Sequence, residues 1–258
     1  MTHETPRFAG TRIVVKVGSS SVSGEKASQI PNLVRSLARL HATGSEVILV
    51  SSGAIATGVP FLRLQERPDD LPTQQAAAAV GQNILVNRYQ RALSVHEIIA
   101  GQVLLTAGDL ENHVHRGNAK RAIERLLQLG ILPIINENDT VATHEIRFGD
   151  NDHLASLVAQ LVGADHLILL SDVDALYTAP PSEPGAERIA QVKFGDPLQG
   201  VEIGAAQSGW GTGGAATKVQ AARLATEAGT TVLLTETRLL DAVLNGEDYG
   251  TLFEANSD

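Results

Sequence analysis

Short apolar segments alternate with helix-like segments along almost the whole chain, and this alternation constrains the fold more than any other feature. The apolar segments are short and rich in β-branched residues, and several of them do not alternate between apolar and polar positions. They lie at residues 12–17, 47–50, 132–135, 167–170 and 231–234. Strands of that composition are buried on both faces, and intervening helices make consecutive strands parallel. The sequence therefore predicts an α/β fold, with a mostly parallel sheet covered by helices on both sides.

The segments between these strands have apolar residues at helical spacing. The expected helices cover residues 30–40, 73–93, 116–129, 154–162 and 218–228. A further strand is expected at residues 98–105 and a small hairpin at 141–148. The proline-containing loop at 178–185 is the expected seam between two lobes.

Composition narrows the class of protein. The chain has 258 residues and no cysteine, which excludes disulfides, thiolate metal sites and cysteine nucleophiles. A net charge of -9 repels nucleic acid and anionic membranes. We expect no signal peptide, and the apolar runs are much shorter than the ~20 residues that a bilayer requires. We expect a cytoplasmic protein that binds neither nucleic acid nor membrane.

Polar residues follow the predicted strands repeatedly. They are Lys16, Gly18 and Ser19 after the first strand, Ser51, Ser52 and Gly53 after the second, and later Asn136 to Asp139 and Ser171, Asp172 and Asp174. In sheets of this kind, ligands bind beyond the carboxyl ends of the strands. We expect these residues to converge on one site.

Two lysines stand next to runs of small residues. Lys16 precedes Gly18, Ser19 and Ser20, and Lys218 ends the glycine-rich segment 209–218. Glycines let backbone N–H groups approach a phosphate, and an ammonium group neutralises it. The alternatives are a solvated lysine at a strand end and a plain surface loop. The spacing at 209–214 matches a dinucleotide fingerprint, but no strand precedes it.

Three other polar segments allow two interpretations each. Ser51 to Ala54 is either a helix cap or a source of N–H groups for a carboxylate. The clusters at residues 136–139 and 148–152 are either turns or a grip for a zwitterion, and their aspartates suit Mg²⁺. His113 and His115 are expected to be solvated, and we expect no metal site built from protein ligands alone.

Taken together, these segments resemble the amino acid kinase family, and within it the members that phosphorylate L-glutamate. The matching stretches share the family's order and are Val14–Ser20, Val50–Ala56, Ala79–Gln82, Ile134–Asp139, Phe148–Asp152, Leu176–Thr178 and Gly211–Gly214. The resemblance implies an open three-layer α/β/α sandwich formed by a single domain, residues 1–258. Its N-terminal lobe, about 1–165, would bind the amino acid, and its C-terminal lobe, about 166–258, would bind the nucleotide.

The resemblance also implies roles for individual residues. Lys16 and Lys218 would stabilise the transferred phosphoryl group, and Asp152 would orient both lysines. The residues implied for substrate binding are Ser52, Gly53, Asn136, Asp139, Asp150 and Asn151. The residues implied for nucleotide binding are Lys16, Ser171, Asp172, Thr212, Gly213, Gly214, Ala215, Ala216, Thr217 and Lys218.

The implied reaction is ATP-dependent phosphorylation of the side-chain carboxylate of L-glutamate to L-glutamyl 5-phosphate, with Mg²⁺ accompanying ATP, at the start of proline biosynthesis. A carboxylate with a pKa near ~4.3 is already ionised at neutral pH, so the reaction needs no general base. A homo-oligomer, dimer or tetramer, and functional coupling to glutamyl phosphate reductase are further expectations.

The chain also departs from the family pattern. Many members carry a C-terminal RNA-binding-like domain that has no counterpart here, and Ala175, Ala179 and Ala215 replace the residues usual at their positions. Two alternatives remain: a kinase of the same superfamily with another acceptor, and a non-catalytic sensor. The segment from Asn136 to Asp152, which is implied to bind the acceptor, carries one arginine, Arg147, and five acidic residues. This composition disfavours an acceptor that itself bears a phosphate.

Overall fold

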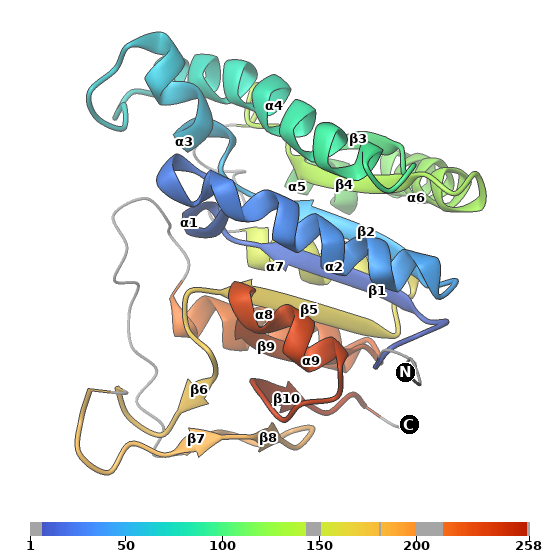
Figure 1. Ribbon diagram of the computed structural model, residues 1–258, viewed down its shortest axis with the longest axis vertical. Coiled ribbons are helices and arrows are strands. Elements are labelled where there is room, and N and C mark those ends of the chain that lie inside the picture. Colours follow the sequence, from blue (N-terminus) through green and yellow to red (C-terminus); the bar gives the residue numbers. More distant parts are fainter. Residues whose placement is uncertain (1–6, 143–150, 181, 200–213, 257–258) are drawn as a thin grey trace.

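The computed structural model describes residues 7–142, 151–180, 182–199 and 214–256, and its centre is a single large β-sheet (Figure 1). The strands of this sheet are β1 (Arg12–Val17), β2 (Glu46–Ser51), β3 (Ala100–Leu105), β4 (Leu132–Glu137), β5 (His166–Ser171), β8 (Gln191–Val192), β9 (Thr231–Glu236) and β10 (Thr251–Phe253). Their spatial order is β3-β4-β2-β1-β5-β9-β10-β8. All neighbouring strands are parallel except β9 and β10, which are antiparallel.

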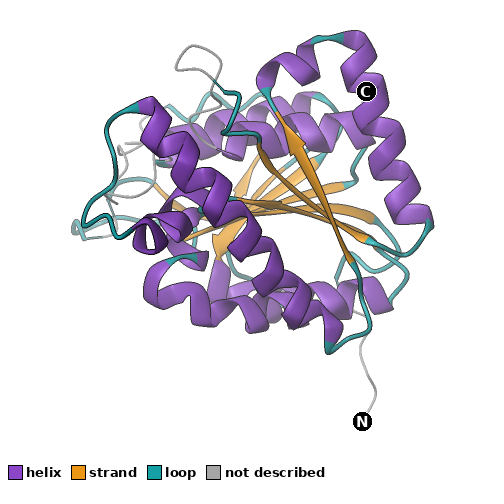
Figure 2. Cartoon of the chain, turned by 90° about the horizontal axis from the view of Figure 1, so that it is seen from above, coloured by secondary structure: helices purple, strands orange, loops and turns teal. Residues whose placement is uncertain are grey.

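Helices cover both faces of the sheet (Figure 2). The α-helices are α1 (Ser19–Val22), α2 (Ile30–Ala42), α3 (Ala54–Gly58), α4 (Leu71–Ser94), α5 (Ala107–Glu111), α6 (His113–Gln128), α7 (Asn151–Val162), α8 (Ala215–Glu227) and α9 (Leu240–Leu244). Short 3₁₀ segments are η1 (Gly24–Gln29), η2 (Val59–Leu62) and η3 (Thr237–Leu239). The fold is thus the predicted three-layer α/β/α sandwich with a mostly parallel sheet.

The alternation of side chains along each strand creates two apolar cores. Ile13, Val15 and Val17 of β1 pack into a core with residues of α2, α4 and α9. Val14 points to the opposite face, into a core with residues of α6, α7 and α8. Because the central strands β1, β2, β4, β5 and β9 are buried on both faces, their sequences are apolar at successive positions. This explains why the central strands were predictable.

The N-terminal and C-terminal parts of the chain form separate halves of the sheet. Strands β1 to β4 form one half of the sheet, and β5, β8, β9 and β10 form the other, so the two halves meet between β1 and β5. The expectation that residues 178–185 form the seam is wrong. That loop joins β6 (Leu176–Tyr177) to β7 (Arg188–Ile189), which pair directly in a small antiparallel sheet.

Helix α3 crosses α4 at very short distance because glycine occupies both contact positions. A Cβ atom on Gly81 would lie 1.8 Å from the carbonyl oxygen of Ala54, and one on Gly58 would lie 1.9 Å from that of Ala77. Neither position admits a side chain, since real Cβ contacts are never this short. The close crossing holds α4 beside the strand ends of the N-terminal half.

Other expectations differ from the structure only in detail. Helix α7 begins at Asn151, three residues before the expected start, and α8 begins at Ala215 rather than at Lys218. Residues 143–148 of the expected hairpin lie outside the described residues. In the described part of the chain, no helix combines the length and apolar character needed to span a bilayer.

Candidate active site

Lys16 is buried in the sheet although it carries a charge. It is the second-to-last residue of β1, and only 3% of its surface is exposed. Its place two residues after Val14 puts its side chain on the face covered by α7 and α8. The interpretation of Lys16 as a solvated flank of the strand is therefore wrong.

Asp152 joins the two lysines that the sequence singled out. It lies in the first turn of α7, and none of its surface is exposed. Its Oδ1 atom forms an ion pair with Nζ of Lys16, and its Oδ2 atom lies 2.9 Å from Nζ of Lys218. The structure thus brings together, on one carboxylate, two lysines from opposite ends of the chain.

The two helices that carry Asp152 and Lys218 are also tied together directly. The hydroxyl oxygen of Ser156, one turn after Asp152 on α7, lies 2.7 Å from the carbonyl oxygen of Ala221 on α8. It also lies 3.1 Å from the carbonyl oxygen of Asp152. Ser156 itself is fully buried. This contact fixes the spacing between α7 and α8, and with it the position of Lys218.

The charges of this trio favour an anion. Two ammonium groups face one carboxylate, so the trio of Lys16, Asp152 and Lys218 carries a net charge of +1. All three side chains are more than nine-tenths buried, and burial strengthens electrostatic interactions because water screens them less. A phosphate or phosphoryl group placed next to the lysines would be stabilised by their positive charge.

The N-terminus of α8 adds backbone donors next to Lys218. Gly214 is the N-cap residue, and no side chain of the described residues caps the helix. The hydroxyl of Thr217 instead donates to the carbonyl of Gly214, at 2.9 Å. N–H groups in the first turn of a helix lack partners within the helix and bind anions. Of the residues expected to bind nucleotide here, Ala215 and Ala216 lie in this turn, while Thr212 and Gly213 lie outside the described residues.

A second group of polar side chains lies beside the first, at the ends of β2 and β4. The side-chain nitrogen of Asn151, which directly precedes Asp152, donates to the carbonyl of Ser51 at 2.6 Å and to Oδ1 of Asn136 at 2.7 Å. Asn151 and Asn136 are both buried. The structure therefore brings together two of the residues expected to bind the substrate and places them next to the lysine trio.

The remaining expected substrate residues are arranged around the end of β2. Ser52 and Gly53 connect β2 to α3 and are half-buried, and Asp139 follows β4 and is 9% exposed. Gly53 has a φ of 93°, and its Cβ would lie 3.3 Å from Cα of Ser19, so this turn suits glycine. Gly53 is the N-cap residue of α3 and its carbonyl accepts from the N–H of Thr57 at 2.9 Å, so this segment does cap the helix, without a side-chain cap among the described residues. Asp150 lies outside the described residues.

The end of β5 contributes the other pair expected to bind nucleotide. Ser171 is buried, Asp172 is exposed, and the hydroxyl of Ser171 donates to Oδ1 of Asp172 at 3.1 Å. The hydroxyl of Thr237, after β9, lies 3.3 Å from the carbonyl oxygen of Ser171 and donates to Oγ of Ser21 at 2.9 Å. Thr237 thus links α1 to the end of β5.

The described residues contain no cluster of three or more histidine or acidic side chains that could hold a metal ion. His115 lies on the surface with its Nδ1 3.1 Å from Oδ1 of Asp109, as expected for a solvated histidine. Asp152 is already engaged by two ammonium groups. Mg²⁺ commonly binds through one or two carboxylates together with substrate phosphates and water.

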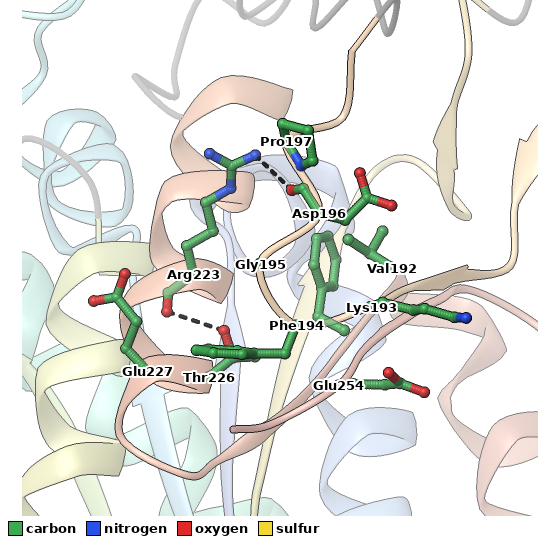
Figure 3. A pocket seen from close by; sticks show the side chains of 11 residues that line it. Val192, Lys193, Phe194, Gly195, Asp196, Pro197, Arg223, Thr226, Glu227 and Glu254 are labelled. Atoms are coloured by element: carbon green, nitrogen blue, oxygen red, sulfur yellow. Dashed lines mark hydrogen bonds between the residues drawn. The ribbon is translucent and has the colours of Figure 1, made fainter. Parts of the chain in front are cut away.

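Figure 3 shows a pocket between α8 and the segment after β8, and neither Lys16 nor Lys218 lines it. It has a volume of about 280 Å³ and is lined by Lys193, Phe194, Arg223 and Glu227, among others. Arg223 already donates to the carbonyl of Asp196, at 3.1 Å. The volume lies just below the usual range for ligand sites, roughly 300–1,000 Å³, and charges of both signs line it. We therefore do not assign the active site to this pocket.

Sequence reasoning missed residues of α4 that support the site. Gln82 donates to the carbonyl of Glu137, at 3.1 Å, and accepts from Asn136, at 3.2 Å. The hydroxyl of Tyr89 lies 2.9 Å from Oγ of Ser51, and burial raises the pKa of this phenol. Gln82 belongs to a stretch shared with the family, but its spacing on a long helix gave no sign of a role.

Comparison with known proteins agrees with this geometry. The model of the amino acid kinase family matches residues 11–236. The chain is 69% identical over 242 residues to the glutamate 5-kinase of Clavibacter michiganensis subsp. michiganensis, covering 94% of this chain and 93% of that protein. It is 70% identical over 243 residues to the glutamate 5-kinase of Leifsonia xyli, covering 94% and 90%. The glutamate 5-kinase of Streptomyces coelicolor is 53% identical over 249 residues, covering 95% of this chain and 67% of that protein.

A solved structure is also similar in fold. Carbamate kinase from Giardia lamblia bound to AMP-PNP superposes with a TM-score of 0.69, covering 97% of this chain and 100% of that one. The sequence identity is 17%, so this likeness concerns the fold alone.

Proposed function

The chain belongs to the amino acid kinase family, and we propose that it transfers the γ-phosphoryl group of ATP to the side-chain carboxylate of L-glutamate. The product would be L-glutamyl 5-phosphate, the first intermediate of proline biosynthesis. The observation that carries this proposal is high identity, over nearly the whole chain, to proteins named for this activity. The buried trio of Lys16, Asp152 and Lys218 supplies chemistry that suits it.

The reaction asks little of the protein beyond alignment and charge neutralisation. The attacking carboxylate is ionised at neutral pH, so no base has to remove a proton. Lys16 and Lys218 would stabilise the negative charge on the phosphoryl group during transfer, and Asp152 would hold both ammonium groups in place. Mg²⁺, bound to the phosphates of ATP, would supply further positive charge.

We assign the two substrates to the two halves of the sheet. Asn136, Asn151 and the turn at Ser52 and Gly53 lie at strand ends of the N-terminal half, and they would bind glutamate together with Asp139 and Asp150. Amide and carboxylate groups suit its ammonium and its carboxylate. The nucleotide would bind in the C-terminal half, at Ser171, Asp172 and the segment 212–218. The lobes would then be about 1–165 and 166–258, within a single domain.

The test is a direct assay. Purified protein is incubated with L-glutamate, ATP and Mg²⁺, and the acyl phosphate is trapped with hydroxylamine as the hydroxamate. We expect hydroxamate with L-glutamate and much less with aspartate, N-acetylglutamate or carbamate. Absence of product with L-glutamate across a range of conditions would refute the proposal. Preference for another acceptor would show that the protein is an amino acid kinase with a different substrate.

A matched pair of lysine variants tests the assigned chemistry. Lys218→Met removes the buried ammonium, and Lys120→Met removes an exposed one on α6, where the side chain is 48% exposed. We expect Lys218→Met to lower kcat about 10²–10³-fold, as does loss of one donor that acts in the transition state. Lys120→Met should retain wild-type turnover. Equal turnover in the two variants would show that Lys218 has another role.

We also propose that the protein acts in the cytoplasm as a homo-oligomer, a dimer or tetramer, and is coupled functionally to glutamyl phosphate reductase. An acyl phosphate hydrolyses readily, which favours rapid use of the product by the next enzyme. Light scattering of the purified protein tests the oligomer. Release of free acyl phosphate, compared with and without the reductase, tests the coupling.

A further inference from the structure

Gln82 on α4 connects to both asparagines of the proposed glutamate site, although it lies outside the residues assigned to it. It is 7% exposed. Its side-chain nitrogen donates to the carbonyl of Glu137, and its side-chain oxygen accepts from the nitrogen of Asn136. Asn136 in turn accepts, on Oδ1, from Nδ2 of Asn151. Three amide side chains thus form one buried chain of hydrogen bonds.

Backbone groups determine which way each amide of this chain points. A backbone carbonyl can only accept, so the nitrogen of Gln82 must face the carbonyl of Glu137. The backbone N–H of Glu137 can only donate, so Oδ1 of Asn136 must face it, at 2.9 Å. The carbonyl of Ser51 likewise requires the nitrogen of Asn151. The orientation of every amide is therefore determined, and Gln82 supplies the only oxygen that Asn136 Nδ2 contacts within the described residues.

The hydrogen bonds of Asn151 limit which of its atoms can contact a substrate. Both hydrogens of Nδ2 of Asn151 are used, one by Ser51 and one by Asn136. The side-chain atom of Asn151 left for a substrate is Oδ1, which can only accept. An Asn151 turned the other way would present a donor instead. The chain of amides thus determines the kind of group that Asn151 can recognise.

We propose that Gln82 is a positioning residue, which holds Asn136, and through it Asn151, in the orientation that binds the amino acid substrate. The proposal rests on the proposed function. It predicts that Gln82 contributes to glutamate binding without touching glutamate, the nucleotide or the phosphoryl group. Gln82 lies on α4, whereas the lysine trio lies on β1, α7 and α8, so turnover should depend little on it.

The first test compares two glutamines of the same helix. Gln82→Met removes the amide but keeps the length of the side chain. Gln90→Met is the matched control, because Gln90 also bonds backbone groups, the carbonyl of Ile98 and the N–H of Ala100, but at the opposite end of the sheet. We expect Gln82→Met to raise KM for glutamate about tenfold, with KM for ATP and kcat changed less than about twofold. Gln90→Met should leave all three constants near wild type.

A pH profile provides a readout that a merely structural role would not change. In Gln82→Glu, an ionised carboxylate would oppose the carbonyl of Glu137, whereas a protonated carboxyl can donate to it and still accept from Asn136. Burial raises the pKa of such a carboxyl toward the neutral range. At each pH, we compare KM for glutamate in Gln82→Glu with the wild-type value. We expect the ratio of the two to fall toward one as the pH is lowered. This variant also serves if Gln82→Met does not fold.

A measurement without substrate separates this proposal from the proposed function. In ¹⁵N–¹H spectra of the free protein, the side-chain NH₂ signals of Asn136 and Asn151 should be protected from exchange in wild type and in Gln90→Met. They should lose protection in Gln82→Met. Unchanged protection would overturn the proposal even in an active enzyme. An unchanged KM for glutamate, equal rises in both KM values, or a change confined to kcat would also overturn it.

Discussion

Replacing Asp152 and Lys218 separately should distinguish what the buried trio does for folding from what it does for turnover. Asp152→Asn leaves two buried ammonium groups without their shared carboxylate. At the 2.9 Å separation of Lys218 Nζ and Asp152 Oδ2, the gross attraction is about 6 kcal/mol for an effective dielectric constant of about 20. Removing one partner of a buried ion pair costs about 3–5 kcal/mol. We therefore expect Asp152→Asn to lose about 3–5 kcal/mol of unfolding free energy.

Lys218→Met should behave differently although it breaks the same ion pair. It leaves Lys16 and Asp152 as a pair of opposite charges, and a methionine side chain fills the space of the lysine stem. Loss of one ion-pair partner is costly when it leaves a buried charge uncompensated, and here Asp152 still faces the ammonium group of Lys16. We expect a change in unfolding free energy within about 1 kcal/mol of zero. The double variant should be more stable than Asp152→Asn, because only one buried ammonium group, that of Lys16, has then lost the carboxylate of Asp152.

Urea denaturation followed by far-UV circular dichroism measures these differences, with hydroxamate formation as the parallel assay. A loss of about 3–5 kcal/mol corresponds to a fall in Tm of about 6–20 °C for a domain of this size. The reasoning is refuted if Asp152→Asn is as stable as wild type, or if Lys218→Met loses as much stability as Asp152→Asn. Dependence of each variant's Tm on protein concentration would reveal a change in assembly instead.

Two further predictions concern stability. Gly81→Ala should lower the unfolding free energy by about 3 kcal/mol or more, because its Cβ would lie 1.8 Å from the carbonyl oxygen of Ala54. Gly117→Ala, inside helix α6 with its nearest contact at 3.5 Å, should raise it by up to about 1 kcal/mol. Urea denaturation of both variants measures the difference. Burial lowers the pKa of His166, so the unfolded chain binds more protons below about pH 6.5. Stability should therefore fall as the pH drops below that value, and His166→Gln should flatten the dependence; an equally steep profile in the variant would contradict this.

The central strands were predictable because burial on both faces makes their own sequences apolar. Strands β1, β2, β4, β5 and β9 are covered on both faces, and this produces runs of apolar residues that are visible without any tertiary information. The polar residues at their carboxyl ends were predictable for the same reason, since the end of each run could be located. The topology then brought Lys16, Asn136 and Ser171 to one edge of the sheet.

The parts that could not be predicted depend on contacts between distant segments. The start of α7 at Asn151 was missed because the residues before it have the composition of a turn. The crossing of α3 and α4 depends on Gly58 meeting Gly81, and neither glycine alone indicates a helix contact. The role of Gln82 likewise depends on Asn136, which lies on a strand 54 residues away in the sequence. Pair relations of this kind carry no local signal.

The same reasoning explains why a carboxylate lies between two lysines that are proposed to bind phosphate. Two ammonium groups placed in a buried site without a counter-ion would repel each other, and an uncompensated buried charge is costly. Asp152 prevents this by binding each ammonium group with a separate oxygen. The charges are then in place before any substrate arrives, so the protein does not have to reorganise during phosphoryl transfer. On this argument, the role we propose for Asp152 is to stabilise the site, and the role we propose for Lys218 is to stabilise the transferred phosphoryl group.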